Sequence, residues 1–160
     1  MDRYKKLLNK ISDHNKVINN ISKQNKNIEK IIQIIFSKIK SDGKILLCGN
    51  GGSAADAQHL TAEFLVRLRP NVNRKPIPAI SLSMDTSTLT ACGNDYNFKD
   101  IFLRPFEALS GRKDVLLVIS TSGNSPNIIN VLAKAKKEKI TTLGFLGKGG
   151  GKAKKLCDYK

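Results

Sequence analysis

A histidine and a carboxylate lie four residues apart in a segment whose composition favours a helix. At this spacing His59 and Glu63 are expected on the same helical face. An imidazole and a carboxylate side by side can bind a metal ion or move a proton. Such a pair is also common on solvated helix surfaces, so the spacing alone leaves both interpretations open.

A glycine-rich turn precedes this pair. Three of the four residues in 49–52 are glycine, and they follow the apolar run 44–48, which predicts a buried strand. A helix is expected from Ala54, with Ser53 as its N-cap. The unpaired amides of such a helix start attract anions, and glycine lets a ligand approach the backbone closely. The glycine turn lacks the Gly-Lys-Ser/Thr ending of a Walker loop, and its glycines do not have the spacing of a dinucleotide-binding fingerprint. We therefore predict an anion site of another kind, with a purely structural turn as the alternative.

A second candidate anion site follows the most apolar strand. Residues 114–119 predict a central strand of a parallel sheet. The next six residues, 120–125, carry four hydroxyl side chains, and Pro126 then favours the start of a helix. Hydroxyl and amide donors together can hold a phosphate. Helix capping alone would explain one of these hydroxyls more readily than all four.

The elements that must position these residues alternate along the chain between strands and helices. This order predicts an α/β fold with an open, mainly parallel sheet and helices on both faces, where ligands lie beyond the carboxyl ends of the strands. We expect further strands at 78–82 and 140–146, a helix that carries Leu89 and is capped by Asp85 or Ser83, a turn at 93–96, and an irregular helix at 100–109.

The first 40 residues predict two helices with more apolar surface than one sheet would cover. We expect this surface to pack against another subunit. Residues 12–15 could interrupt the first helix or lie on its polar face. The expected division is an oligomerisation segment at 1–42 followed by a ligand-binding domain at 43–160.

Composition limits the possible functions. The 160 residues carry a net charge of +15, but this charge is mostly dispersed lysine, which argues against a nucleic-acid binder and would still attract an anionic substrate. No apolar run is long enough to span a membrane, and the start of the chain does not resemble a signal peptide. Three widely spaced cysteines form neither a disulfide framework nor a metal clip. We expect a cytoplasmic protein.

Four segments together resemble the sugar isomerase (SIS) family of phosphosugar-binding domains and, within it, the phosphoheptose isomerases. The segments are 48–53 with Asp56, His59 and Glu63, then 93–95, 119–125 and 147–151. The resemblance implies a three-layer, flavodoxin-like fold with an N-terminal helical extension. It also implies a homotetramer with active sites shared between subunits.

The resemblance further implies an aldose–ketose isomerase that converts sedoheptulose 7-phosphate into glycero-manno-heptose 7-phosphate for lipopolysaccharide or related glycans. Glu63 would be the catalytic base, and His59 and Glu63 would hold one zinc ion per subunit. The phosphate would be held by Ser120, Thr121, Ser122 and Ser125. The sugar would contact Asn50, Gly51, Gly52, Ser53, Glu63, Asn94 and Asp95.

Members of this family continue with a strand and a helix that bring a Gln and a second His to the metal. This sequence has no counterpart, since its only other histidine is His14. We therefore expect a C-terminally incomplete domain. The alternative function is a non-catalytic SIS protein that binds phosphosugars or associates with a replication initiator.

Overall fold

The computed structural model of the protein describes residues 2–160. The internal contacts divide the chain into one unit of residues 1–33 and another of residues 34–160. The boundary after residue 42 stays a prediction.

The N-terminal unit is helical. Helix α1 spans Arg3–Ile21, a short 3-10 turn covers Ser22–Gln24, and α2 begins at Asn25 and runs to Lys40 in the second unit. Residues 12–15 lie inside α1, so the interruption comes later, at the 3-10 turn. Apolar side chains of α1 are exposed, including Leu7 at 55%, Ile11 at 49% and Ile18 at 49%.

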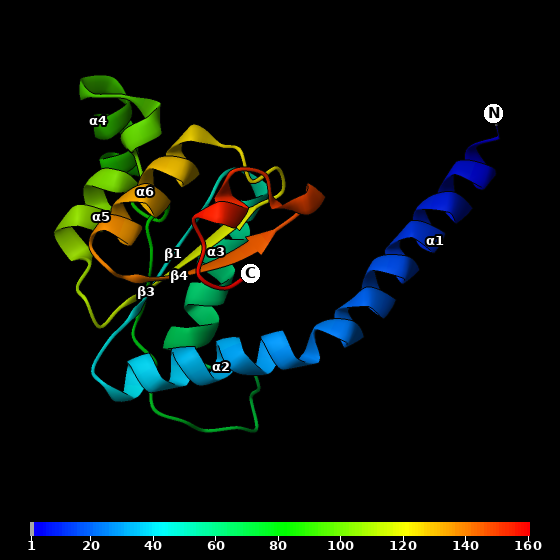
Figure 1. Cartoon of the computed structure of the whole chain (residues 1–160), viewed down its shortest axis with the longest axis horizontal. Helices are drawn as coiled ribbons and strands as arrows, with labels where there is room; N and C mark the ends of the chain where they lie inside the picture. Colours follow the sequence, from blue (N-terminus) through cyan, green and yellow to red (C-terminus); the bar gives the residue numbers. More distant parts are fainter. Residues whose placement is uncertain (1) are drawn as a thin grey trace. The chain divides into compact units, whose positions relative to one another are not determined.

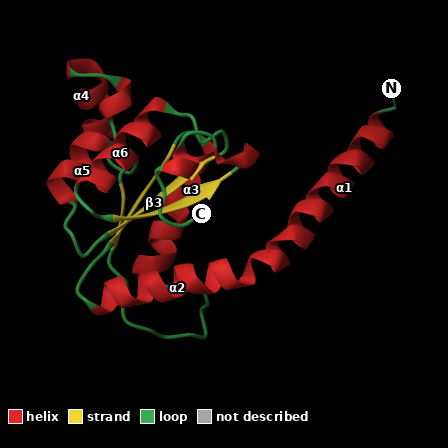
Figure 2. Ribbon diagram, in the orientation of Figure 1, coloured by secondary structure: helices red, strands yellow, loops and turns green. Residues whose placement is uncertain are grey.

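The second unit is built on a parallel four-stranded sheet in the order β2-β1-β3-β4 (Figures 1 and 2). The strands are β1 Ile45–Gly49, β2 Ala79–Ser81, β3 Val115–Ser120 and β4 Thr141–Leu146. Register pairs Gly49 of β1 with Ile119 of β3, so these two strands end side by side. The predicted α/β class and parallel sheet are confirmed.

Helices cover both faces of this sheet. They are α3 Gly52–Leu65, α4 Thr86–Asp95, α5 Leu103–Leu109 and α6 Pro126–Lys137, with 3-10 turns at Phe98–Asp100, Lys148–Gly150 and Ala153–Lys155. Alternate residues of a strand point to opposite faces, and both sets in β1 and β3 are buried. This explains why these strands are continuous apolar runs.

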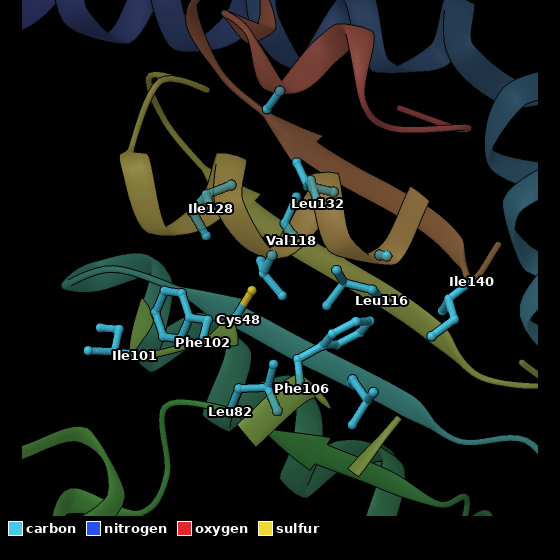
Figure 3. Packing of buried hydrophobic residues seen from close by; sticks show 14 of the residues in the cluster. Cys48, Leu82, Ile101, Phe102, Phe106, Leu116, Val118, Ile128, Leu132 and Ile140 are labelled. Atoms are coloured by element: carbon cyan, nitrogen blue, oxygen red, sulfur yellow. The ribbon is translucent and has the colours of Figure 1, made fainter. Parts of the chain in front are cut away.

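The larger core lies between the sheet and the helices α5 and α6, as Figure 3 shows. Phe102 and Phe106 belong to this buried cluster together with Cys48, Leu116 and Val118 of the sheet and Ile128 and Leu132 of α6. Burying each large apolar side chain stabilises the fold by about 1.5–3 kcal/mol. This core anchors α6, and with it the serine-rich turn that precedes the helix.

Two local predictions are wrong. Helix α3 starts at Gly52 with Gly51 as its N-cap, so Ser53 lies in the first turn of the helix. Gly51 adopts a φ of 57°, which glycine tolerates and which lets the helix begin earlier. The expected turn at 93–96 is instead the end of α4, which runs to Asp95. Its predicted cap is confirmed, because the Asp85 carboxylate accepts a hydrogen bond from the Ser87 amide at 3.1 Å.

The outer edge of β4 is partly covered by the last residues of the chain. Tyr159 forms a parallel bridge with Leu143, and its carbonyl accepts a 2.9 Å hydrogen bond from the amide of Gly144. The Asp158 carboxylate accepts from both the amide and the hydroxyl of Thr142, at 2.9 and 3.0 Å. Residues 158–159 therefore satisfy part of the outer edge of the sheet.

Among residues 2–160 there is no helix with the length and apolar character needed to cross a bilayer.

Candidate functional site

The glycine turn joins β1 to α3, and two of its glycines are required by geometry. A Cβ on Gly49 would lie 2.3 Å from the carbonyl oxygen of Ser53, which is too close for any other residue type. Gly51 holds a positive φ at the helix N-cap. The turn therefore brings the first amides of α3 directly onto the end of the strand, where they can face an anion.

The serine turn joins β3 to α6, and its hydroxyls differ in what they do. The Ser120 hydroxyl is buried and accepts a hydrogen bond from the amide of Gly123 at 3.0 Å. The Ser122 hydroxyl accepts from the amide of Asn124 at 3.2 Å. Ser125 is the N-cap of α6, but its side chain makes no capping hydrogen bond. Each hydroxyl keeps its own hydrogen for donation, since accepting from an amide uses only a lone pair.

A third loop, residues 147–152, packs against the serine turn, and the sequence did not indicate this contact. A Cβ on Gly123 would lie 2.0 Å from the carbonyl oxygen of Gly150. The Ala153 amide donates to the Gly123 carbonyl at 2.9 Å, and the Lys152 amide donates to the Asn124 side chain at 3.0 Å. The glycines of this loop therefore let two backbones meet, and the contact fixes the shape of the serine turn.

The two turns are also joined directly. The side-chain amides of Asn50 and Asn127 exchange two hydrogen bonds, each 2.9 Å long. Asn50 follows β1, and Asn127 lies in the first turn of α6. The chain leaves β1 toward β2 on one side and leaves β3 toward β4 on the other, which is the arrangement that opens a ligand crevice between strand ends. The structure thus brings the predicted sugar-contacting turn and the predicted phosphate-holding turn together.

The acid–base pair lies on α3. Nε2 of His59 is 3.5 Å from Oε1 of Glu63, and the histidine side chain is 72% exposed. Oε2 of Glu63 is buried and has no hydrogen-bond partner in residues 2–160. A buried carboxylate oxygen without a partner costs about 1–3 kcal/mol, so a ligand, a proton or a cation is expected to satisfy it.

The far end of α3 is held by an arginine that sequence reasoning missed. The Arg74 guanidinium donates to the carbonyl oxygen of Phe64 at 2.9 Å and to that of Glu63. These carbonyls belong to the last turn of the helix, where cations are favourable. Arg74 therefore fixes the backbone that carries the Glu63 carboxylate.

The acid–base pair is separated from the glycine turn within one chain. Glu63 lies eleven residues after Gly52, so helical rise places the two about 16 Å apart along α3. Asn94 and Asp95 occupy the last turn of α4 and are exposed. The Asn94 amide donates to Asp95 at 2.8 Å, and in residues 2–160 no hydrogen bond links either of them to the two turns. The structure assembles the two turns but does not bring these four residues to them.

The donor set for a metal is partial. His59 and Glu63 offer an imidazole nitrogen and a carboxylate with one unpartnered oxygen, both of which suit zinc. Within the described chain no group of three or more His, Cys, Asp or Glu side chains could hold a metal ion. The residues present therefore fit as two ligands of a zinc site, where three protein ligands are usual.

Comparison with known proteins identifies the family. Residues 11–147 match the SIS domain family. The phosphoheptose isomerase of Clostridium acetobutylicum is 53% identical over 132 residues, which cover 82% of this chain and 66% of that protein. Phosphoheptose isomerase 1 of Campylobacter jejuni is 48% identical over 147 residues, which cover 92% of this chain and 78% of that protein.

Solved structures agree. The phosphoheptose isomerase of Neisseria gonorrhoeae superposes with a TM-score of 0.87 at 34% identity, covering 98% of this chain and 82% of that one. The phosphoheptose isomerase of Francisella tularensis gives the same TM-score at 31% identity, with 99% and 82% covered. The chain therefore belongs to the SIS domain family and, within it, to the phosphoheptose isomerases.

Proposed function

We propose that this protein is an isomerase that interconverts sedoheptulose 7-phosphate and glycero-manno-heptose 7-phosphate, in the synthesis of heptose for lipopolysaccharide or a related glycan. The observation that carries the proposal is the pairing of Asn50 with Asn127, which joins a glycine turn and a hydroxyl-rich turn at adjacent strand ends. One turn suits a phosphate, and the other suits the hydroxyl groups of a sugar. The relatives that the chain matches are named phosphoheptose isomerases.

Isomerisation requires a proton to move between two carbons. A base removes a proton from C1 of the ketose while the C2 carbonyl oxygen takes a proton, which gives an enediol. Return of a proton to C2 and loss of the proton on the C1 oxygen leave the aldehyde. Glu63 is the proposed base, because its Oε2 is buried, unpartnered in the described chain and therefore available to accept a proton.

Phosphate binding is assigned to Ser120, Thr121, Ser122 and Ser125. The hydroxyl hydrogens of Ser120 and Ser122 remain available, because their oxygens accept from turn amides. The N-terminal end of α6 adds a favourable dipole. When the phosphate is bound at the serine turn, the sugar end of the substrate points toward the turn that contains Asn50.

Zinc is the proposed metal, with His59 and Glu63 as its two ligands from the described chain. Bound zinc would polarise the substrate carbonyl and stabilise the negative charge that develops on it. Independently of the metal, α3 holds the imidazole and the carboxylate on one face, and Arg74 fixes the backbone of the last turn.

The active site is proposed to form between copies of the chain. Glu63 lies about 16 Å along α3 from Gly52, and Asn94 and Asp95 have no hydrogen bond to either turn within residues 2–160. A second copy would bring one group of residues to the turns of the other. The exposed apolar side chains of α1 support an oligomer, and a homotetramer is the proposed state.

A non-catalytic phosphosugar-binding protein is the second candidate function. It is favoured by one observation, that the described chain offers two metal ligands rather than three. A cytoplasmic location is proposed for both candidates, which agrees with three free cysteines.

The test is conversion of sedoheptulose 7-phosphate by the purified protein in D2O, with zinc added and with zinc chelated. Turnover with solvent deuterium at C2 of the product is expected, because the proton that the base removes from C1 can exchange with solvent before a proton returns to C2. Glu63→Gln should abolish turnover and keep substrate binding, whereas Glu138→Gln, at an exposed surface ion pair with Lys134, should change neither. Substrate binding without turnover under any metal condition would favour the non-catalytic candidate.

A further inference from the structure

We infer that Asn127 is a positioning residue that orients the Asn50 amide and so couples the phosphate turn to the sugar turn. This inference rests on the proposed function for its substrate but on the observed hydrogen bonds for its geometry. Asn127 is only 1% exposed, while Asn50 is partly exposed at the site. Asn127 is thus placed to act through Asn50 rather than to touch a ligand.

The orientation of the Asn127 amide is determined by its own helix. The amide of Ile128 donates to Oδ1 of Asn127 at 3.0 Å, so this atom must be the acceptor. Nδ2 of Asn127 must then be the donor to Oδ1 of Asn50, and Nδ2 of Asn50 must donate in return. The start of α6 therefore determines the orientation of the Asn50 side-chain amide on the other turn.

The remaining hydrogen-bonding capacity of Asn50 is equally defined. A side-chain amide has two N–H donors and two acceptor lone pairs. Asn127 uses one of each, so Asn50 keeps one donor and one acceptor in fixed directions. A hydroxyl group beside a carbonyl, as at the reactive end of a ketose, can use both.

This arrangement reduces the entropic cost of binding. Without Asn127 the Asn50 side chain could rotate and exchange its donor and acceptor positions, and a ligand would have to order it. Fixing a side chain in advance improves affinity because that ordering cost is already met. Loss of one neutral hydrogen-bonding arrangement typically changes affinity by about 3- to 10-fold.

The experiment is a double-mutant cycle on substrate binding. Asn127→Leu keeps the number of side-chain heavy atoms and removes both hydrogen bonds to Asn50 together with the one from the Ile128 amide, and it is combined with Asn50→Ala. The matched control is Asn130→Leu in the same helix, whose amide donates to Asp100 at 2.7 Å and to the Lys99 carbonyl at 3.2 Å, neither of which belongs to the two turns. Calorimetry measures the affinity for sedoheptulose 7-phosphate and, separately, for inorganic phosphate.

We expect Asn127→Leu to weaken sedoheptulose 7-phosphate binding by about 3- to 10-fold and inorganic phosphate binding by less than about twofold. The double variant should bind as Asn50→Ala does, because Asn127 acts through that residue. Asn130→Leu should leave both affinities unchanged. Additive losses, or equal losses for the two ligands, would overturn the inference.

A second measurement separates this inference from the proposed function. The side-chain amide signals of Asn50, observed by NMR with 15N-labelled asparagine, should show protected protons that become exchangeable in Asn127→Leu and not in Asn130→Leu. Unchanged Asn50 signals in Asn127→Leu would refute the positioning role, whatever the substrate. Failure of the wild-type protein to bind sedoheptulose 7-phosphate would refute the proposed substrate and leave the NMR result to decide the role of Asn127.

Discussion

Replacement of Gly123 by alanine should damage the serine turn more than any replacement that only strains the backbone. Gly123 has a φ of 63°, and an added Cβ would lie 2.0 Å from the carbonyl oxygen of Gly150. That oxygen belongs to a backbone, so it cannot swing away as a side chain could. Residues 147–152 would have to move as a unit.

The expected cost has two parts. A left-handed conformation costs a non-glycine residue about 1–2 kcal/mol. Moving the loop also breaks the hydrogen bonds from Ala153 to Gly123 and from Lys152 to Asn124, each worth about 1 kcal/mol. We therefore expect Gly123→Ala to lower the free energy of unfolding by about 3–4 kcal/mol.

Gly149 provides a matched control. Its φ is 78°, but no atom lies within 4 Å of an added Cβ, so Gly149→Ala should incur only the conformational cost of about 1–2 kcal/mol. Urea unfolding at one fixed protein concentration measures both variants, because association would otherwise shift the midpoint. Calorimetry with inorganic phosphate should show weaker binding for Gly123→Ala alone.

Equal destabilisation by the two alanine variants would show that the contact between the loop and the serine turn is not needed for folding. Unchanged phosphate binding by Gly123→Ala would show that this contact does not shape the site.

Three further outcomes concern residues outside the two turns. Gly93→Ala should raise the free energy of unfolding by about 0.5–1 kcal/mol in urea, because Gly93 lies inside α4 with open space around it. Asp114→Asn should lower it by about 2–3 kcal/mol, since the buried carboxylate pairs with Lys44 at 2.6 Å. The pKa of the Asp85 carboxyl lies below its usual value, chiefly because the Thr88 hydroxyl donates a hydrogen bond to it. The stabilisation of α4 by ionised Asp85 should therefore persist at neutral pH and be lost only as the pH falls through this lowered pKa. An NMR titration should show a higher pKa of Asp85 in Thr88→Val.

Thiol labelling gives one more expected outcome. Burial raises the pKa of the Cys157 thiol to about 11, and burial also raises the pKa of Cys48 and Cys92. All three should react slowly with iodoacetamide at pH 8 until urea unfolds the protein, as measured by mass spectrometry. Fast labelling in the folded state would contradict the observed burial.

The sheet and the two turns at its strand ends could be predicted because their signals are local. The runs 44–48 and 114–119 are apolar on both faces, and this pattern is typical of a strand that is covered on both sides. The end of α4 differs from the prediction because Gly93 and Asn94 favour turns in isolation. In the protein, α4 continues through both residues, because the low helix propensity of two exposed residues changes the stability of a helix only slightly.

The link between the two turns could not be predicted, because its partners are far apart in sequence. Asn127 looks like an ordinary polar residue near a helix start, and its partner lies 77 positions earlier. The glycines of residues 147–151 likewise suggest a loose loop rather than a tight contact with Gly123. Such pairings depend on which strands end side by side, and a single sequence does not state that order.

The covering of β4 by residues 158–159 limits how copies of this protein can associate. An open strand edge recruits strands from other chains and promotes aggregation. Here the backbone of Thr142 and Gly144 is already hydrogen-bonded to Asp158 and Tyr159, and at the opposite edge β2 is only three residues long. A strand from another copy would therefore have to displace Asp158 and Tyr159 to pair with Thr142 and Gly144, and at the other edge it could pair with only the three residues of β2.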